Sequence, residues 1–108
     1  MNTMLKPFFT YILRCADGSY YTGSTDELEK RIAEHQNGEG GTWTRKRLPV
    51  VFVWRQEFPT REEAMATEHQ IKRWSRAKKE ALIDGNFDLL KLLASRSQLS
   101  RAVRDTSK

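Results

Sequence analysis

The stretch Phe9–His35, FTYILRCADGSYYTGSTDELEKRIAEH, decides the fold that this sequence predicts. Its first part is rich in aromatic and β-branched residues, which favours a strand over residues 8–15. The dipeptide Asp17-Gly18 is a strong signal for a two-residue hairpin turn, so residues 19–23 are expected to return antiparallel. The register of the two strands is left open, because the sequence does not determine which residues lie opposite each other.

A helix is expected to follow the hairpin directly. The sequence Ser24-Thr25-Asp26-Glu27 matches a capping box with acidic residues in the first turn. The helix should end near Gln36, because Asn37-Gly38 is a typical helix stop. Arg31 and His35 are four residues apart and therefore share one helix face. Together with Tyr11 and Tyr21, they form a set of polar side chains that the hairpin and helix bring toward one another.

The rest of the chain predicts one more strand and three more helices. Residues 38–49 read as a mobile glycine-containing loop, and Val50–Phe58 reads as a third strand whose apolar start suits a central position. Thr60 and Glu63 form a second capping box, Ser75–Gly85 is a further helix, and a last helix begins after Asn86. The order β-β-α-β-α-α-α predicts an α+β fold in which helices flank a three-stranded antiparallel sheet.

Glu68 is the unusual residue of the second predicted helix. It lies on the apolar line that also contains Ala64 and Ile71, so its carboxylate is expected to face inward. A buried carboxylate is costly unless something pairs with it. The residues alone leave two partners open, a structural arginine or a metal ion.

The charge distribution points to a polyanionic partner. Residues 1–40 carry four basic and six acidic side chains, whereas residues 41–108 carry fifteen basic and eight acidic ones, giving net charges of −2 and +7. Nucleic acid is the first candidate for such a partner, although a net charge of +5 is also ordinary for a small domain.

Two segments are candidates for a nucleic-acid contact surface. In the loop at 38–49, a tryptophan lies beside three cations, which is typical of a surface that binds backbone and bases, unless the tryptophan folds back on the core. The second segment, at 72–79, is either a solvated face or an approach to Glu68. The candidate nucleic-acid-binding residues are Trp43, Arg45, Lys46, Arg47, Lys72, Arg73, Trp74, Arg76, Lys78 and Lys79.

Several classes are disfavoured by composition. The sequence has no apolar run long enough to span a membrane and no signal-peptide pattern, which favours a cytoplasmic protein. One cysteine and two histidines make a zinc site improbable, and Cys15 is expected to be a buried strand residue rather than a nucleophile. The expected organisation is a single domain over residues 1–94, followed by a flexible basic tail over residues 95–108.

These residues resemble the GIY-YIG nuclease family, in particular its small single-domain bacterial members. Phe9-Thr10-Tyr11 stands in the position of the GIY motif, and Tyr21-Thr22-Gly23 stands in that of YIG. Glu68, in ATEHQIKRW, matches the glutamate on the later helix of the family. The resemblance covers roughly residues 7–92, and the matching positions also include Ser24, Leu28, Arg31 and His35.

The resemblance implies a phosphodiester hydrolase with one divalent metal ion, Mg²⁺ or Mn²⁺, anchored by Glu68. Tyr11 would activate the attacking water, with Tyr21 assisting it or exchanging that role, and Arg31 would neutralise phosphate charge. His35 would orient a tyrosine or contact phosphate. A phenolate at pH 7 costs roughly 4 kcal/mol for an ordinary tyrosine, so positive charge must lie nearby. The implied catalytic residues are Tyr11, Tyr21, Arg31, His35 and Glu68.

The expected substrate is DNA, with single-stranded or branched DNA preferred because unstacked bases can lie on exposed aromatic rings. An inactive nucleic-acid-binding module of the same fold is the alternative, and a protein-interaction module that uses the basic tail is a third. The four residues Tyr11, Tyr21, Arg31 and Glu68 argue against pure binding, since a binder does not need them together.

Overall fold

A computed structural model describes residues 6–95 of the chain, which form two compact units divided between Lys72 and Arg73. The first unit contains β1 (Phe8–Arg14), β2 (Tyr20–Thr25), α1 (Leu28–Gln36), α2 (Thr42–Arg45), β3 (Val51–Phe58) and α3 (Arg61–Lys72). The second contains α4 (Arg76–Ile83) and further helical residues at 87–95. Most of the basic tail predicted at 95–108 lies outside the described residues.

The sheet has three antiparallel strands in the order β2-β1-β3. The chain turns at Asp17-Gly18 as predicted, but the loop has three residues, 16–18, rather than two, because the amide of Cys15 donates to the carbonyl of Ser19 and, of the three, only Gly18 has a positive φ, of 86°. The predicted strand boundaries agree with the observed ones to within about two residues. The prediction that the third strand is central is wrong. β1 is central, whereas β3 is an edge strand whose Val51 and Phe52 are exposed. An edge position explains why an apolar start did not lead to burial.

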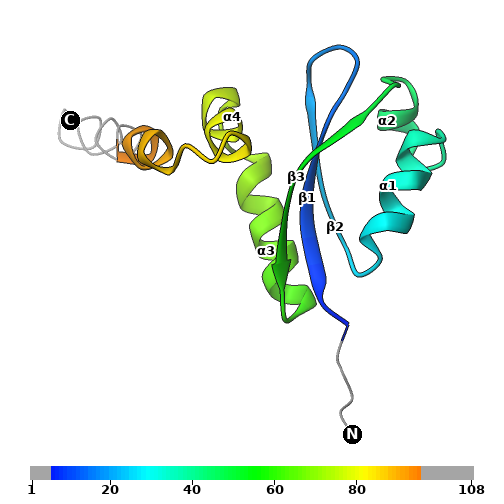
Figure 1. The fold of residues 1–108 in the computed structure, drawn as a ribbon, viewed down its shortest axis with the longest axis horizontal. Coiled ribbons are helices and arrows are strands. Elements are labelled where there is room, and N and C mark those ends of the chain that lie inside the picture. Colours follow the sequence, from blue (N-terminus) through cyan, green and yellow to red (C-terminus); the bar gives the residue numbers. More distant parts are fainter. Residues whose placement is uncertain (1–5, 96–108) are drawn as a thin grey trace, which may run out of the picture. The chain divides into compact units, whose positions relative to one another are not determined.

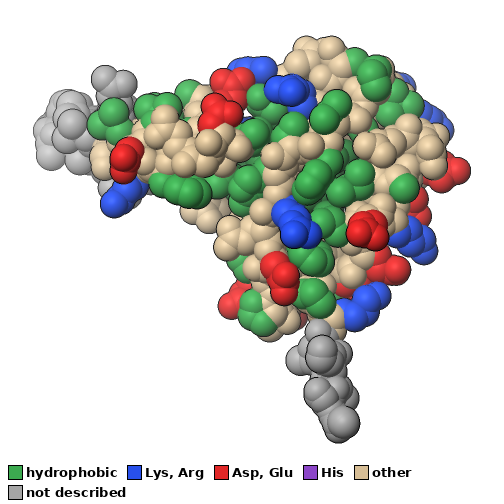
Figure 2. All heavy atoms as spheres, viewed as in Figure 1, with side chains coloured by type: hydrophobic (Ala, Val, Ile, Leu, Met, Phe, Trp, Pro, Cys, Tyr) green, Lys and Arg blue, Asp and Glu red, His purple; other side chains and the backbone are tan. Residues whose placement is uncertain are grey.

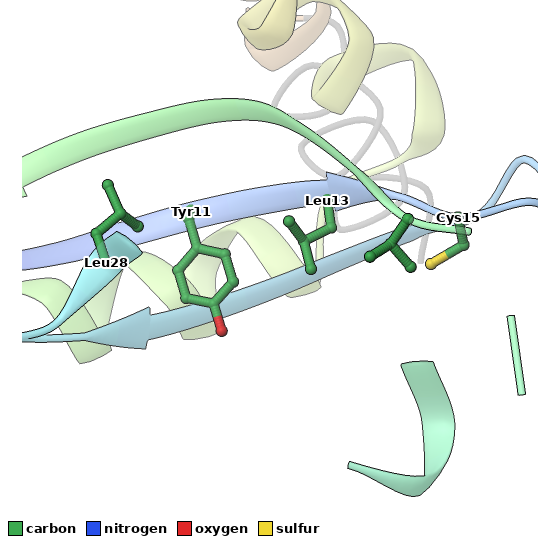
Figure 3. Packing of buried hydrophobic residues seen from close by; sticks show 5 residues of the cluster. Tyr11, Leu13, Cys15 and Leu28 are labelled. Atoms are coloured by element: carbon green, nitrogen blue, oxygen red, sulfur yellow. The ribbon is translucent and has the colours of Figure 1, made fainter. Parts of the chain in front are cut away.

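Helices cover both faces of the sheet, with α1 and α2 on one side and α3 on the other (Figure 1). On the α3 side, the hydroxyl of Thr10 donates to the carbonyl of Ala64 over 2.7 Å. On the other side, Tyr11 and Leu13 of β1, together with Cys15 directly after it, project the same way and pack with Leu28 of α1 (Figure 3). This alternation fixes which polar residues of each strand can reach which helix.

The helix starts follow the sequence only in part. The second capping box is confirmed, since the amide of Glu63 donates to the hydroxyl of Thr60. The first is wrong: α1 begins at Leu28 without a side-chain cap. The hydroxyl of Ser24 instead donates to the carboxylate of Glu68 over 2.6 Å. Ser24 therefore makes a hydrogen bond to a distant helix in place of the hydrogen bond within the first turn of α1 that the capping box predicts.

The second unit is capped at both of its helix starts. Ser75 accepts a hydrogen bond from the amide of Lys78 at the start of α4, and Asn86 accepts one from Leu89 at the start of the helical residues 87–95. Asn86 therefore has a local structural role. Among the described residues, no helix is long and apolar enough to cross a membrane.

Candidate active site

The register of the hairpin brings the two tyrosines to the same face. Tyr11 lies opposite Gly23 and Leu13 lies opposite Tyr21. Residues two apart on a strand share a face, as do residues directly opposite each other, so Tyr11 and Tyr21 both face α1. Their ring centroids are 6.3 Å apart. Tyr11 is only 1% exposed, whereas Tyr21 is partly exposed.

His35 joins this pair from the last turn of α1. Its Nε2 lies 3.0 Å from the phenolic oxygen of Tyr11, and its Nδ1 lies 2.9 Å from the hydroxyl oxygen of Thr44 in α2. The ring centroid of Tyr21 is 4.9 Å from that of His35. Because His35 is 1% exposed and both ring nitrogens have internal partners, the arrangement suits a histidine that orients Tyr11 rather than one that contacts phosphate.

Electrostatics keep both members of the Tyr11–His35 pair neutral. Burial is the main cause that raises the pKa of Tyr11 above its usual 10, and Tyr21 adds to the effect while Arg31 opposes it. Burial, with the nearby Arg31, also lowers the pKa of His35 below 6.5. Arg31 alone therefore does not supply the phenolate that the sequence argument required.

Arg31 lies on the rim of the tyrosine cluster. Its guanidinium is 3.5 Å from the carboxylate of Glu34, one turn further along α1, and the side chain is 43% exposed. It is close enough to influence the pKa values of both Tyr11 and His35. An exposed ion pair of this kind contributes little to stability, so Arg31 can exchange Glu34 for an incoming anion at small cost.

Glu68 approaches from the opposite face of the sheet. Its carboxylate accepts the hydrogen bond from Ser24 on one oxygen, and its other oxygen lies 2.7 Å from Nζ of Lys72. The inward orientation predicted for Glu68 is confirmed, since its side chain is 14% exposed. The cation that pairs with it in the chain is a lysine, where the sequence argument named an arginine.

The two halves of the site meet at the edge strand β2. Gly23 and Ser24 are neighbours, and they face the tyrosine side and the Glu68 side respectively. Glu68 is near enough to raise the pKa of Tyr11. A Cβ atom at Gly23 would lie 2.6 Å from the hydroxyl oxygen of Tyr11, so only glycine lets the phenol lie across the strand.

The segment expected to be a mobile loop folds against the site. It contains α2, and Gly40 packs so closely on the ring of His35 that a Cβ atom there would collide with it. Trp43 lies 6.0 Å from Tyr21 between ring centroids, yet it is 41% exposed. The tryptophan therefore folds back toward the site in part, while its role in a nucleic-acid contact surface stays a prediction.

Arg47 differs from the other cations of this segment. Its guanidinium donates to the carbonyl of Trp43 over 2.8 Å, lies 3.3 Å from the carboxylate of Asp17, and stacks 3.9 Å from the centre of the Trp43 ring. These internal contacts make Arg47 a structural residue, whereas the neighbouring Arg45 and Lys46 are exposed.

The other predicted nucleic-acid-binding residues lie on either side of the boundary between the units. Lys72 ends the first unit and pairs with Glu68. In the second unit, Arg76 pairs with Glu80 at 3.0 Å, and Nζ of Lys78 lies 6.0 Å from the Trp74 ring centre. Arg73 is exposed, while burial and Arg76 lower the pKa of Lys79. On the face drawn in Figure 2, basic and acidic side chains are interspersed rather than separated.

Sequence reasoning missed Thr44 and the hydrogen-bonding role of Ser24. Thr44 lies on a four-residue helix, which is too short to produce a periodic pattern. Ser24 did give a signal, but that signal was assigned to a helix cap. The predicted burial of Cys15 is confirmed, and burial raises its pKa, although β1 ends one residue earlier, at Arg14.

Comparison with known proteins identifies the family. A model of the GIY-YIG catalytic domain matches residues 7–81. A UPF0213 protein of Natronomonas pharaonis is 48% identical over 80 residues, which cover 74% of this chain and 94% of that protein. A UPF0213 protein of Streptococcus pneumoniae serotype 4 is 44% identical over 80 residues, covering 74% and 81%.

A solution NMR structure of an E. faecalis protein shares the fold. It is 38% identical, has a TM-score of 0.53, and the similarity covers 82% of this chain and 93% of that one. The predicted three-stranded α+β architecture is therefore confirmed. On its motifs, its fold and its relatives, this chain belongs to the GIY-YIG family.

Proposed function

We propose that the chain is a divalent-metal-dependent endonuclease that hydrolyses phosphodiester bonds in DNA and prefers single-stranded or branched substrates. The observation that carries the proposal is the cluster of Tyr11, Tyr21 and His35, with Arg31 on its rim and Glu68 in electrostatic range. A phosphodiester hydrolase needs a proton acceptor for water and positive charge for the phosphate. This cluster offers both kinds of group.

Arg31 is the residue proposed to hold the scissile phosphate. A phosphate oxygen competes well with a carboxylate for a guanidinium, since both can accept two parallel hydrogen bonds. The partner that must be displaced, Glu34, is held at only 3.5 Å on the surface. Arg31 would then stabilise the charge that accumulates on the phosphate as the water attacks.

Tyr11 and Tyr21 are the proposed proton-accepting pair. Tyr21 is the member that solvent can reach, and Tyr11 lies behind it, hydrogen-bonded to His35. Because burial raises the pKa of Tyr11, the phenol stays protonated at neutral pH until further positive charge arrives. The two tyrosines would therefore act on a water molecule only after metal and substrate have bound.

The residues around Glu68 fit a metal held by one carboxylate. Among the described residues, no group of three or more His, Cys, Asp or Glu side chains could enclose an ion. Mg²⁺ does not require such a group, because it keeps several waters and binds through one or two carboxylates and substrate phosphate. Lys72 would have to leave Glu68, which is feasible for a lysine whose side chain is 48% exposed. When bound, the ion would polarise the phosphate and lower the pKa of a coordinated water.

The preference for unpaired DNA rests on the segment beside the site. Trp43 is partly exposed next to Tyr21, and the exposed cations Arg45 and Lys46 follow it. Stacking of an unpaired base on an aromatic ring contributes about 1–3 kcal/mol, and it requires a base that is free of its partner strand. Exposed cations beside the ring would bind the backbone.

A cleavage assay on matched oligonucleotides tests this function. Single-stranded, duplex and branched DNA of one sequence would be incubated with Mg²⁺, with Mn²⁺, and with EDTA. Cleavage with either metal, lost in EDTA and faster on unpaired DNA, is expected. Equal rates on all three forms would overturn the preference. DNA binding that EDTA does not affect, with no cleavage over long incubation, would instead support an inactive binding module.

A further inference from the structure

The hydrogen bonds around His35 form a chain with a determinable direction. It runs from the phenol of Tyr11 to Nε2 of His35, and from Nδ1 of His35 to the hydroxyl of Thr44. The Thr44 hydroxyl also lies 3.4 Å from the carbonyl oxygen of Gly41, which can only accept. Neutral imidazole carries one ring proton, so the question is which nitrogen carries it.

Counting donors and acceptors answers this question. If Nδ1 carries the proton, Tyr11 donates to Nε2, Nδ1 donates to Thr44, and Thr44 donates to Gly41, so all three protons have acceptors. If Nε2 carries it, the Tyr11 hydroxyl needs another acceptor, and within residues 6–95 no third group hydrogen-bonds to it. Buried donors are rarely left without acceptors, so the first arrangement is favoured.

We propose that Thr44 is a positioning residue that holds His35 in the Nδ1–H tautomer, so that Nε2 accepts the Tyr11 proton. The consequence concerns the polarity of Tyr11. Because the Tyr11 hydroxyl donates its single proton to His35, its oxygen can act only as an acceptor toward any other group. For the hydroxyl to take a proton from water, its own proton must pass to Nε2 of His35, which only this polarity allows. The catalytic part of the inference rests on the proposed nuclease function, whereas the tautomer does not.

The surroundings of His35 support a neutral ring that can hold one tautomer. Tyr11 faces it from β1, Tyr21 from β2, and Arg31 and Glu34 influence it from α1. Burial and Arg31 disfavour a second ring proton more than Glu34 favours one. Gly40 packs so closely on the ring that a Cβ atom there would collide with Nδ1, which leaves the imidazole enclosed on that side.

Nitrogen-15 NMR of the histidine ring tests the tautomer directly, in the full-length chain and without any substrate. The ring nitrogen shifts of His35 at pH 7.5 should show a protonated Nδ1 and a bare Nε2. Thr44→Val, which removes the hydroxyl but keeps the shape, should move the population toward Nε2–H, and Thr44→Ser should restore the original pattern. Thr44→Ala serves as a second variant if the valine protein does not fold. Thr42→Val, on an exposed residue of the same helix, is the matched control.

The kinetic arm separates the two proposals. Thr44→Val should lower kcat for DNA cleavage by about 10- to 100-fold, the scale on which partners that orient functional histidines act, and leave KM nearly unchanged. Thr44→Ser should recover most of the rate. A protonated Nε2 in the wild type, or a tautomer that is unaltered in both Thr44→Val and Thr44→Ala, would overturn the inference. Absence of cleavage by a wild type with the expected tautomer would overturn the nuclease function alone.

Discussion

The phenolic oxygen of Tyr11 lies 3.0 Å from Nε2 of His35, and both side chains are 1% exposed. A hydrogen bond between two buried polar side chains stabilises a fold only while both groups keep the protonation states that the bond requires. Tyr11 also belongs to the central hydrophobic cluster, so this one residue contributes both to the candidate active site and to the stability of the core.

The stability of the protein should fall as the pH drops below about 6.5. Burial lowers the pKa of His35 in the folded chain, so the unfolded chain binds its proton first. The stability from a neutral His35 is complete above the unfolded pKa and is lost as the pH falls toward the folded one. Urea unfolding between pH 7.5 and pH 5 measures this loss. His35→Gln should show a flatter pH dependence over the same range, and equal slopes would contradict the assignment.

Gly23→Ala should lower the free energy of unfolding by about 1–3 kcal/mol, the usual cost of overpacking. The new methyl group would collide with the Tyr11 hydroxyl, which must move away from His35 or push β2 outward. Chemical denaturation gives the free energy, and Tyr11 side-chain resonances report the displacement. Ala33→Ser, on the exposed side of α1, is the control and should change little. An unaltered stability for Gly23→Ala would show that the phenol does not depend on this close approach.

Local chemistry in the sequence was enough to predict most of the elements. The chain turns at Asp17-Gly18, although through three residues rather than two, Thr60 caps its helix, and the helix that carries His35 ends at Gln36. Each of these features depends on residues within a few positions of one another. Glu68 was also found from local information, because a carboxylate on an apolar helix line is conspicuous.

Contacts between distant segments were beyond the sequence. The capping-box pattern at Ser24 predicts a hydrogen bond within the first turn of the helix. In the fold, the Ser24 hydroxyl instead donates to the distant Glu68, because the packing of α3 on the sheet brings the two side chains together. Tyr11 and Tyr21 share a face because of the β1–β2 register, which the residue types of the two strands do not predict. The edge position of β3 follows from the strand order, which an apolar run cannot reveal.

Arg47 and Lys46 should behave differently although they are adjacent cations. Arg47→Ala removes contacts to Asp17 and to both the ring and carbonyl of Trp43, so the melting temperature should fall and tryptophan fluorescence should change. Lys46→Ala removes an exposed charge, so the melting temperature should stay the same. DNA affinity should fall for Lys46→Ala, with the salt-dependence slope decreasing by about 1. A salt slope that Lys46→Ala leaves unaltered would remove this residue from the DNA surface.

Lys72→Met should increase the affinity for Mg²⁺. The lysine ammonium lies 2.7 Å from the Glu68 carboxylate and competes with any cation for it. Without the lysine, the carboxylate keeps Ser24 as its partner within residues 6–95, and added Mg²⁺ should raise the melting temperature at lower concentrations than in the wild type. Lys91→Met removes the same charge from an exposed position in the second unit and should leave the Mg²⁺ response unaffected. If both variants respond like the wild type, Glu68 is not the metal ligand.

Replacing Tyr11 and replacing Tyr21 should have different effects on the stability and on the cleavage rate. Tyr11→Phe removes the partner of a buried histidine, so it should lower both the stability, by about 1–3 kcal/mol, and the cleavage rate. Tyr21→Phe removes a hydroxyl from a partly exposed ring and should leave the unfolding free energy nearly unchanged. If Tyr21 contacts the water directly, its loss should lower kcat by about 10²–10⁴-fold, the range for a positioned proton acceptor. Urea unfolding and single-turnover cleavage on the same preparations measure both quantities. A Tyr21→Phe protein with normal stability and normal cleavage would assign proton transfer to Tyr11 and His35 alone.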